Sequence, residues 1–480
     1  MEVRKSRYNS YKSLIWLISI VFVLMMNKTN AAERYELKFQ VKGIQDTICY
    51  LANYYGDKTY LTDTAVVDEK GRFVFEGDSV LPGGIYIIAG QAKNKYFECI
   101  VDKDQNFSIV SDLSDISAKA KISNSLDNEL FFEYIVRNIN HHKNITKLKQ
   151  QKAVLVDQPD SLLIINNQIE AATEDLVVFQ QNLIEDNPET FVSVLLKAMI
   201  EPTVPEKLNE DGRLDSVYQY QYYKSHYWDN FDLTDDRLLR TPLFNSHMER
   251  FFAEVVYQQP DSIVQEADIF IEKTRPNKEV FKYVVWYLTY KFEMSKIMGF
   301  DEIFVHMVDT YYAKGDAFWA DSTVVKSLSN RANELRGILI GSTAPNLILL
   351  DTAGGYTSMN YYPAEFMVVL FYESNCNHCK KEITALKTWL AEETLDVKVF
   401  AVCTDTSLSD WKKFIRDYDL DWINVNGTRS VTRDYHNLYD IRLTPTIFLL
   451  DEKKKILAKR LKTDQLEPFL RNYTKSLKSN

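Results

Sequence analysis

The stretch FMVVLFYESNCNHCKKEI, residues 366–383, joins a run of large apolar residues to two cysteines that are two residues apart. The run FMVVLFY carries no charge, which is typical of a strand buried on both faces of a sheet. After the cysteines, Ile383, Leu386, Trp389 and Leu390 recur at helical spacing and give a helix its buried stripe. A buried strand followed directly by a helix predicts an α/β sheet.

The alternation of strands and helices continues to the C-terminus. VKVFAVC (397–403) predicts a second strand, and an amphipathic helix follows it. TPTIFLLDEKKKILAKRL (444–461) predicts a hairpin, and a last helix is expected to begin near Thr463. Residues 337–480 are therefore predicted to form one α/β domain with helices on both faces of its sheet.

Two segments of different character precede this domain. In residues 33–125 short runs of alternating polarity, such as YELKFQV, are separated by polar turns, which predicts a small antiparallel sandwich or barrel of unknown function. Residues 126–336 have apolar residues at helical spacing and predict an all-α domain. The expected fold class is multidomain α+β, with a β-sandwich-like domain, an all-α domain and a C-terminal α/β domain.

Residues 1–32 have the order of regions found in a secretory signal peptide. The basic segment MEVRKSRYNSYK precedes an almost wholly apolar run from Leu14 to Met26, and Ala31 and Ala32 supply small residues for cleavage. The apolar run is short for a membrane-spanning helix. We therefore expect an exported, periplasmic protein, and an uncleaved signal that tethers the chain to the membrane is the alternative.

The composition limits the class of partner. A net charge of −10 and an isoelectric point near 5.4 give no basis for binding nucleic acid. Five cysteines in 480 residues do not make a disulfide scaffold. Cys49, Cys99 and Cys403 are interpreted as buried small hydrophobic residues, while a Cys49–Cys99 pairing stays open.

Cys376 and Cys379 are placed where a helix begins. Ser374 or Asn375 is expected to cap this helix, so that Cys376 lies in its first turn, near unpaired N–H groups and the positive end of the helix dipole. Sulfurs in such positions have pKa values of about 3.5 to 7.5, against about 8.5 for a free cysteine. Cys379 is expected to be more buried and less acidic. This asymmetry suits thiol–disulfide exchange.

Two ionisable neighbours can assist the cysteines. His378 lies between them, where an imidazolium would stabilise the thiolate of Cys376. Glu382 follows Cys379 by three residues on the same helix face and can take the proton that the inner thiol loses. The alternative for Glu382 is an exposed carboxylate that only complements the helix dipole.

Zinc binding is the main chemical alternative for the cysteine pair. A structural zinc site needs four ligands, and the sequence has no second Cys-x-x-Cys or Cys/His pair. Cys403 and His436 would complete a set only if the fold brought them to Cys376 and Cys379. We therefore expect no metal and no cofactor.

With these motifs in this order, residues 337–480 resemble the thioredoxin-fold domain of periplasmic thiol–disulfide oxidoreductases of the TlpA/ResA type. The resemblance is carried by GSTAPNLILLDTAGG, VVLFYESNCNHCKKE and LTPTIFLLDEKKKIL, and it covers about a third of the chain. The regions upstream resemble the arrangement in exported Bacteroidota proteins, in which a β-rich domain of unknown function and a helical domain precede a thioredoxin-like domain. The third domain is thus expected to be thioredoxin-like.

The resemblance implies a role for each matching residue. Cys376 would attack a substrate disulfide and Cys379 would resolve the mixed disulfide, so that the two form the redox disulfide. Glu382 matches an acid that ResA-like members carry just after the dithiol. Pro445 would be a cis-proline beside the sulfurs, and Thr444 would bind an extended substrate segment through its backbone.

Departures from the family pattern bear on the direction of electron flow. The residues between the cysteines are Asn377 and His378, where reductases of this type often have a proline. A histidine before the second cysteine is similar to oxidase and isomerase dithiols, and it raises the reduction potential by stabilising the reduced thiolate. Leu370 stands where cytosolic thioredoxins bury an aspartate, so Glu382 would act alone.

The expected activity is disulfide exchange with periplasmic protein thiols or disulfides. The resemblance favours the reductase direction, with a membrane protein as electron donor. One alternative is a thiol peroxidase, since GSTAPNLILLD also opens peroxiredoxins, although Glu373 stands where their Thr-x-x-Cys pattern has threonine. The other is a module that binds a partner or ligand and in which the dithiol is secondary.

Overall fold

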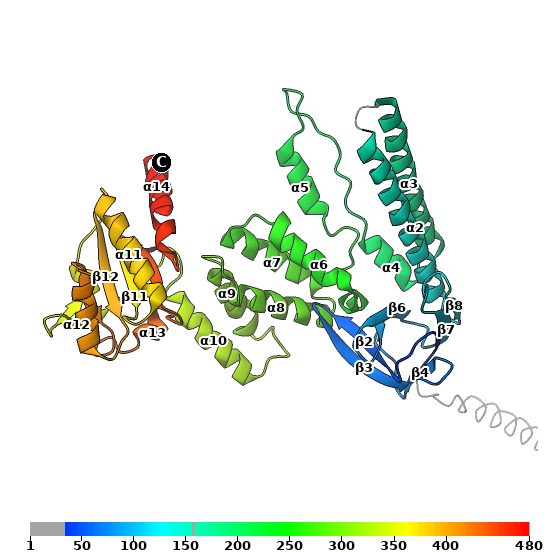
Figure 1. The fold of residues 1–480 in the computed structure, drawn as a ribbon, viewed down its shortest axis with the longest axis horizontal. Helices are drawn as coiled ribbons and strands as arrows, with labels where there is room; N and C mark the ends of the chain where they lie inside the picture. The colour runs from blue at the N-terminus through cyan, green and yellow to red at the C-terminus, as the bar shows by residue number, and fades with distance from the viewer. Residues whose placement is uncertain (1–33, 156–158, 480) are drawn as a thin grey trace, which may run out of the picture. The chain divides into compact units, whose positions relative to one another are not determined.

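The structure is a computed structural model that describes residues 34–155 and 159–479 (Figure 1). It has a β-rich N-terminal region, a helical central region and a thioredoxin-like C-terminal domain, so the predicted fold class is confirmed. These residues divide into two compact units, and the boundary in the chain lies between Val255 and Val256. The predicted signal peptide lies outside the described residues, and no helix within them is long and apolar enough to cross a membrane.

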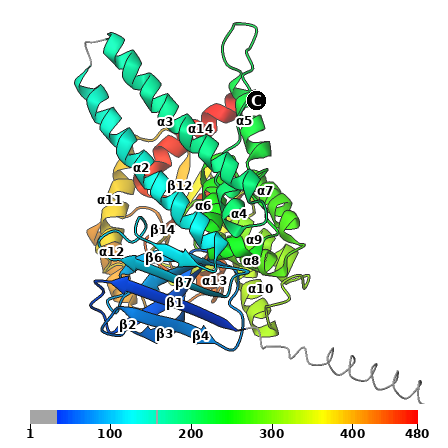
Figure 2. The ribbon, with the colours of Figure 1, turned by 90° about the vertical axis from the view of Figure 1, so that its right-hand side faces the viewer.

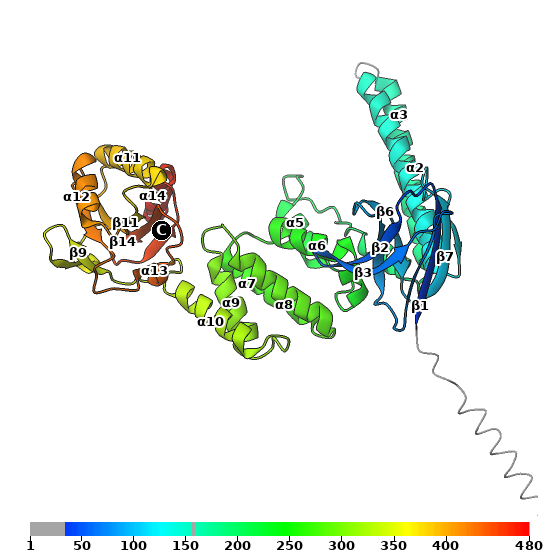
Figure 3. The ribbon, with the colours of Figure 1, turned by 60° about the horizontal axis from the view of Figure 1, so that its bottom comes forward.

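The first unit opens with two four-stranded sheets that share one core (Figure 3). Their strand orders are β4-β1-β7-β8 and β3-β2-β5-β6. All neighbours are antiparallel except β1 and β7, which are parallel, with Phe39 opposite Ile109. The antiparallel expectation is wrong for this pair, because the chain builds the other sheet between the two strands and so makes the long crossover that parallel pairing needs. The strands are β1 Tyr35–Lys42, β2 Ile48–Tyr55, β3 Lys58–Val66, β4 Arg72–Gly77, β5 Gly84–Ala89, β6 Lys95–Val101, β7 Asn106–Asp112 and β8 Lys121–Ser123.

Alternate residues of both sheets form the sandwich core. Phe39 stacks on Phe73 with 5.2 Å between ring centroids and meets Phe97 of the other sheet at 5.8 Å. Cys49 and Cys99 are fully buried here, and both are free thiols. Their interpretation as buried small hydrophobic residues is confirmed, and burial raises the pKa of Cys49 to about 11.

Helices complete the first unit. Ser125 caps the first of them by accepting a hydrogen bond from the Asn128 N–H at 3.3 Å. Figure 2 shows α2 and α3 side by side as a long hairpin, in which Ile165 and Leu183 are the buried residues of α3. The helices are α2 Leu126–Val154, α3 Pro159–Asp186, α4 Phe191–Ala198, α5 Ser216–His226, η1 Asp236–Arg240, α6 Pro242–Arg250 and η2 Phe251–Val255.

The second unit joins the remaining helices of the central region to a seven-stranded sheet of order β10-β9-β13-β12-β11-β14-β15. Strand β11 lies between β12, to which it is parallel, and β14, to which it is antiparallel. The first helices are α7 Pro260–Thr274, α8 Lys278–Glu293, α9 Asp301–Met307, η3 Val308–Tyr312 and α10 Ser322–Arg336. The strands are β9 Ile348–Asp351, β10 Tyr356–Ser358, β11 Phe366–Tyr372, β12 Val397–Cys403, β13 Ile423–Asn426, β14 Thr446–Asp451 and β15 Ile456–Lys459. The later helices are η4 Met359–Tyr361, α11 Asn377–Glu392, α12 Leu408–Asp417, α13 Tyr435–Leu438 and α14 Thr463–Ser479.

Helices cover both faces of this sheet, as predicted (Figure 3). Leu370 of β11 shares a core with Ile383 of α11 and Leu466 of α14. The next residue, Phe371, points to the opposite face and meets Tyr439, at the end of α13, with 5.1 Å between ring centroids. The alternation of side chains along β11 thus places α11 against one face of the sheet. The loop that carries the cysteines begins at the C-terminal end of β11.

Candidate active site

The two cysteines lie where strand β11 ends and helix α11 begins. All residues of β11 are buried, so the strand fixes the point at which the next loop leaves the sheet. Helix α11 begins at Asn377, and Cys376 is its N-cap, with the sulfur accepting a hydrogen bond from the Cys379 N–H at 3.2 Å. The expectation that Ser374 or Asn375 caps the helix is wrong. The sulfur itself fills the place that a serine or aspartate oxygen usually takes.

The surroundings of the Cys376 sulfur favour its ionised form. Burial by itself raises the pKa of Cys376, but it is outweighed by hydrogen bonds from the Cys379 thiol, from the backbone N–H groups of Cys379 and His378, and from the Thr444 side chain. The pKa of Cys376 is therefore lowered, in the direction that the sequence predicts. Its partly exposed position leaves the sulfur accessible to a substrate.

Cys379 has the opposite character. It is fully buried, and burial followed by its hydrogen bond to Cys376 raises the pKa of Cys379 to about 12. Cys376 and Cys379 are both free cysteines in this structure. An acidic outer sulfur and a protonated inner sulfur lie within hydrogen-bonding reach of each other.

The loop before β14 lies against the outer sulfur. The Thr444–Pro445 peptide bond is cis, as the family resemblance implies. When Cys376 is protonated, its thiol donates a hydrogen bond to the Thr444 carbonyl, with 3.8 Å between sulfur and oxygen. Leu443, the preceding residue, is 80% exposed. The loop thus presents backbone groups and one large apolar side chain beside Cys376.

Glu382 contacts the start of α14. Its Oε2 accepts a hydrogen bond from the Thr463 N–H at 2.9 Å, and its backbone carbonyl accepts one from the Thr463 hydroxyl at 3.3 Å. This contact between two helices gives Glu382 a structural role that the sequence did not indicate, and its role in proton transfer stays a prediction. His378 is exposed, and its backbone N–H is a group that donates to the Cys376 sulfur.

Asp405 belongs to the site although the sequence analysis did not single it out. It follows β12, and its carboxylate accepts hydrogen bonds from the Ser374 N–H at 2.8 Å and from the Cys403 thiol at 3.3 Å. Asp405 therefore ties the loop that carries Cys376 to the adjacent strand. The available signal was its position just after a parallel strand, because the carboxyl ends of such strands meet at one edge of a sheet.

Metal-ligating side chains do not gather at the dithiol. Across residues 34–155 and 159–479, no three or more His, Cys, Asp and Glu side chains form a group that could hold a metal ion. Cys403 is buried and bonded to Asp405, and burial raises the pKa of its thiol. The ring of His436 lies against Tyr435, with 4.2 Å between ring centroids.

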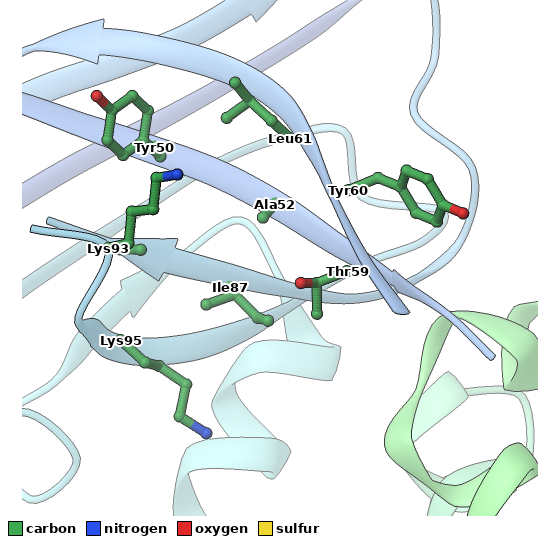
Figure 4. A pocket seen from close by; sticks show the side chains of 9 residues that line it. Tyr50, Ala52, Thr59, Tyr60, Leu61, Ile87, Lys93 and Lys95 are labelled. Carbon is green, nitrogen blue, oxygen red and sulfur yellow. The ribbon is translucent and has the colours of Figure 1, made fainter. Parts of the chain in front are cut away.

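A separate hollow of about 460 Å³ lies in the first unit, on the outer face of the sheet β3-β2-β5-β6 (Figure 4). Ala52, Ile87 and Ala89 line it together with Tyr60 and Lys93. Sequence analysis missed this hollow. The signal was present in β2 and β5, where residues on the outward face are apolar although the solvent face of a sandwich is usually polar.

Family models match three parts of the chain. The AhpC/TSA family matches residues 340–459, and two domains of unknown function, DUF5106 and DUF4369, match residues 168–328 and 35–131. No curated protein matches the chain.

Several solved structures of bacterial proteins are similar to less than a third of this chain. A domain of a possible thiol-disulfide isomerase from Cytophaga hutchinsonii is 35% identical, over 30% of this chain and 98% of its own length, with a TM-score of 0.28. The thioredoxin domain of a thiol-disulfide oxidoreductase from Bacteroides vulgatus is 31% identical, over 28% of this chain and 98% of its own length, with a TM-score of 0.26. A thiol:disulfide interchange protein from a Bacteroides species is 30% identical, over 28% of this chain and 91% of its own length, with a TM-score of 0.27.

Proposed function

Since the chain belongs, through its C-terminal domain, to the thioredoxin-fold thiol–disulfide oxidoreductases, we propose that it exchanges disulfides with periplasmic protein substrates through its Cys-Asn-His-Cys dithiol. One arrangement carries the proposal: the Cys376 sulfur caps helix α11 and accepts a hydrogen bond from the Cys379 N–H at 3.2 Å, while Cys379 is fully buried. These hydrogen bonds lower the pKa of Cys376, and burial raises the pKa of Cys379. Exchange needs a nucleophile that is ionised at the start and a second thiol that stays protonated until the mixed disulfide has formed.

In the reductase direction the reaction has two steps. The Cys376 thiolate attacks one sulfur of the substrate disulfide, and the other substrate sulfur leaves as a thiolate. Cys379 then loses its proton and attacks the Cys376 sulfur, which releases the second substrate thiolate and forms the Cys376–Cys379 disulfide. Two electrons have passed to the substrate. Glu382 is proposed to receive the Cys379 proton, and His378 to tune the reduction potential.

The substrate is proposed to bind as an extended segment along the cis-proline loop. The Thr444 backbone offers hydrogen bonds of the kind that an added strand makes. Leu443 is 80% exposed and would pack on an apolar side chain next to the substrate cysteine. A substrate with an apolar residue beside its disulfide fits this surface.

Export and electron supply complete the proposal. The basic and apolar segments of residues 1–32 support export to the periplasm. We propose a membrane protein as electron donor, because an exported reductase must be re-reduced on its own side of the membrane. The β-rich and helical regions would recruit or orient the partner.

The test is reduction of insulin disulfides by the purified chain, with dithiothreitol as electron source. Cys376→Ser should reduce the rate to the background level, and Cys49→Ala, a buried cysteine in the first unit, serves as control. A Cys376→Ser variant that keeps the parent rate would refute the proposal. The reduction potential of the dithiol indicates the direction of electron flow. A value of about −270 mV or below indicates a reductase, and a value of about −120 mV indicates an oxidant.

The AhpC/TSA match keeps thiol peroxidase as a second candidate. Glu373 occupies the position of the peroxiredoxin threonine, which argues against it. Fast peroxide consumption by the parent chain without any disulfide substrate would favour the peroxidase. A third candidate is a ligand- or partner-binding module, which is favoured if a phenotype of the gene persists with Cys376→Ser.

A further inference from the structure

A buried carboxylate, that of Asp440, lies at the start of the cis-proline loop, which contacts the dithiol. Asp440 has a left-handed backbone, with φ of +47°, and its side chain is 3% exposed. It accepts hydrogen bonds from Arg331 Nη1 at 2.7 Å and Nη2 at 2.8 Å and from Arg442 Nε at 2.9 Å, and it also contacts Arg460. A buried carboxylate needs such partners, because an unpaired one is strongly destabilising.

Arg331 is the most buried of the three arginines that contact Asp440. Its side chain is 15% exposed, against 66% for Arg442 and 48% for Arg460. Its planar guanidinium binds both oxygens of Asp440, an arrangement that adds geometric specificity as well as energy. Arg331 lies on α10, so a residue of the helical region holds a residue of the thioredoxin-like domain within the second unit.

A second buried ion pair fixes the same helical segment to β15. The Lys459 ammonium pairs with Asp301 of α9 and donates to the Ile338 carbonyl at 2.7 Å. The side chains of Lys459 and Asp301 are 4% and 16% exposed. Arg460, the next residue, contacts Asp440. Lys459 and Arg460, which are adjacent at the end of β15, are thus held by Asp301 of α9 and by Asp440.

Thr444, which contacts the dithiol, follows Asp440 by four residues. Thr444 accepts the hydrogen bond from the Cys376 sulfur, and its side chain lowers the pKa of both cysteines. The intervening loop is also held from its far side, where the Thr446 hydroxyl donates to the Leu443 carbonyl at 2.7 Å. A displacement of Asp440 therefore changes where Thr444 lies relative to Cys376.

We propose that Arg331 of the helical region is a positioning residue for the dithiol: by holding Asp440 it fixes residues 441–445 and keeps Thr444 against Cys376. This inference rests on the proposed exchange function and extends it. Through this contact helix α10, whose residue Arg331 follows the segment 168–328 that matches a domain of unknown function, acts on the chemistry of the thioredoxin-like site.

The experiment compares three variants of the full chain. Arg331→Ala removes the contact, and Arg331→Lys keeps the charge without the two-pronged geometry. Arg336→Ala is the matched control, since Arg336 lies on the same helix and pairs with Asp309 in an exposed ion pair at 2.7 Å. The measurements are the Cys376 titration by thiolate absorbance, the reduction potential against glutathione, and kcat and KM for insulin.

Arg331→Ala should move the Cys376 titration to higher pH, make the potential more reducing, and lower kcat/KM for insulin about tenfold or more, because small misplacements of reacting groups are costly. Arg331→Lys should fall between Arg331→Ala and the parent. Arg336→Ala should stay within about twofold of the parent in kcat/KM, as exposed ion pairs contribute little.

A folded Arg331→Ala that matches Arg336→Ala in titration and potential would overturn the inference. If Arg331→Ala does not fold, Arg331→Gln, which keeps one hydrogen bond to Asp440, takes its place under the same criteria. Insulin reduction that survives Cys376→Ser contradicts the proposed function instead. In that case the Cys376 titration and the reduction potential of the Arg331 variants still show whether Arg331 positions the sulfur. A failure of the proposed function can therefore be told apart from a failure of this inference.

Discussion

The carboxylate of Glu382 accepts a hydrogen bond from the Thr463 N–H at 2.9 Å and so joins the dithiol helix to the last helix of the chain. Glu382 therefore has two separable functions: it docks α14, and it is proposed to receive the proton of Cys379. The two can be tested apart, because an amide side chain keeps an oxygen acceptor but does not take up a proton at neutral pH.

Glu382→Gln should keep its melting temperature within about 2 °C of the parent while the release of the mixed disulfide slows about 10²-fold. Glu382→Ala should show the same slow release and lose about 1 kcal/mol of unfolding free energy, since the Thr463 N–H is left without its acceptor. Single-turnover release of a labelled substrate and thermal unfolding measure the two effects. Unchanged release in both variants would leave Glu382 with the docking role alone.

The pH dependence of the first step follows from the lowered pKa of Cys376 and the raised pKa of Cys379. The attack rate on a small disulfide should rise with pH until Cys376 is fully ionised and then stay constant. Because the pKa of Cys376 is lowered, this plateau should begin at a lower pH than for a free cysteine, whose pKa is about 8.5. Cys379, with a pKa of about 12, should contribute no step in this range. A lowered pKa stabilises the reduced fold above the ordinary thiol pKa, and this stabilisation is lost as pH falls through the folded value. A rate that keeps rising beyond pH 9 would contradict the assignment.

Asp440 should control stability in acid. Burial alone raises its pKa, but hydrogen bonds from Arg331 and Arg442 and the charges of Arg331 and Arg460 lower it to about 2, from an ordinary value of 3.8. The difference corresponds to about 2 kcal/mol, present above pH 4 and lost as pH falls towards 2. Asp440→Asn should therefore be less stable near neutrality and show a flatter stability profile between pH 4 and pH 2, measured by urea unfolding.

The control for Asp440 is Asp309→Asn, which breaks an exposed ion pair with Arg336 on the same helix as Arg331. It should cost no more than about 1 kcal/mol. Equal losses in the two variants would mean that the burial of Asp440 adds nothing.

Leu443 should determine affinity for protein substrates. Leu443→Ser should raise KM for insulin roughly tenfold, which is about 1.4 kcal/mol and a fraction of the value of burying a leucine. The rate with a small aromatic disulfide should stay within about twofold, because such a substrate does not reach along the loop. Leu477→Ser, which changes an exposed leucine near the end of α14, is the matched control. An unchanged KM for insulin would remove Leu443 from the substrate surface.

The elements around the dithiol could be predicted because their signals are local. A continuous apolar run marks β11, and a helical stripe beginning at Ile383 marks α11. The hairpin of β14 and β15 and the start of α14 at Thr463 were likewise found where expected. Each of these signals needs only a window of a few residues.

The helix cap was predicted wrongly for a reason that lies outside such a window. Ser374, Asn375 and Cys376 can all serve as an N-cap by residue type or size, and the local sequence does not choose among them. In the structure the Ser374 N–H donates a hydrogen bond to Asp405, which follows the adjacent strand β12. This holds Ser374 in the loop, and the helix begins after Cys376.

The remaining contacts of the site join residues far apart in sequence. Glu382 and Thr463 are separated by 81 positions, and Arg331 and Asp440 by 109. No local pattern indicates that a glutamate docks a helix or that an arginine on a helical segment pairs with a buried aspartate. Such contacts appear only once the sheet order and helix placement are known.

Strand β1 has both of its neighbours, β4 and β7, later in the chain. In a chain that is synthesised from its N-terminus, the middle of this sheet is therefore present before either of its neighbours. Until Asn106–Asp112 has emerged, one edge of β1 remains open to strands of other molecules.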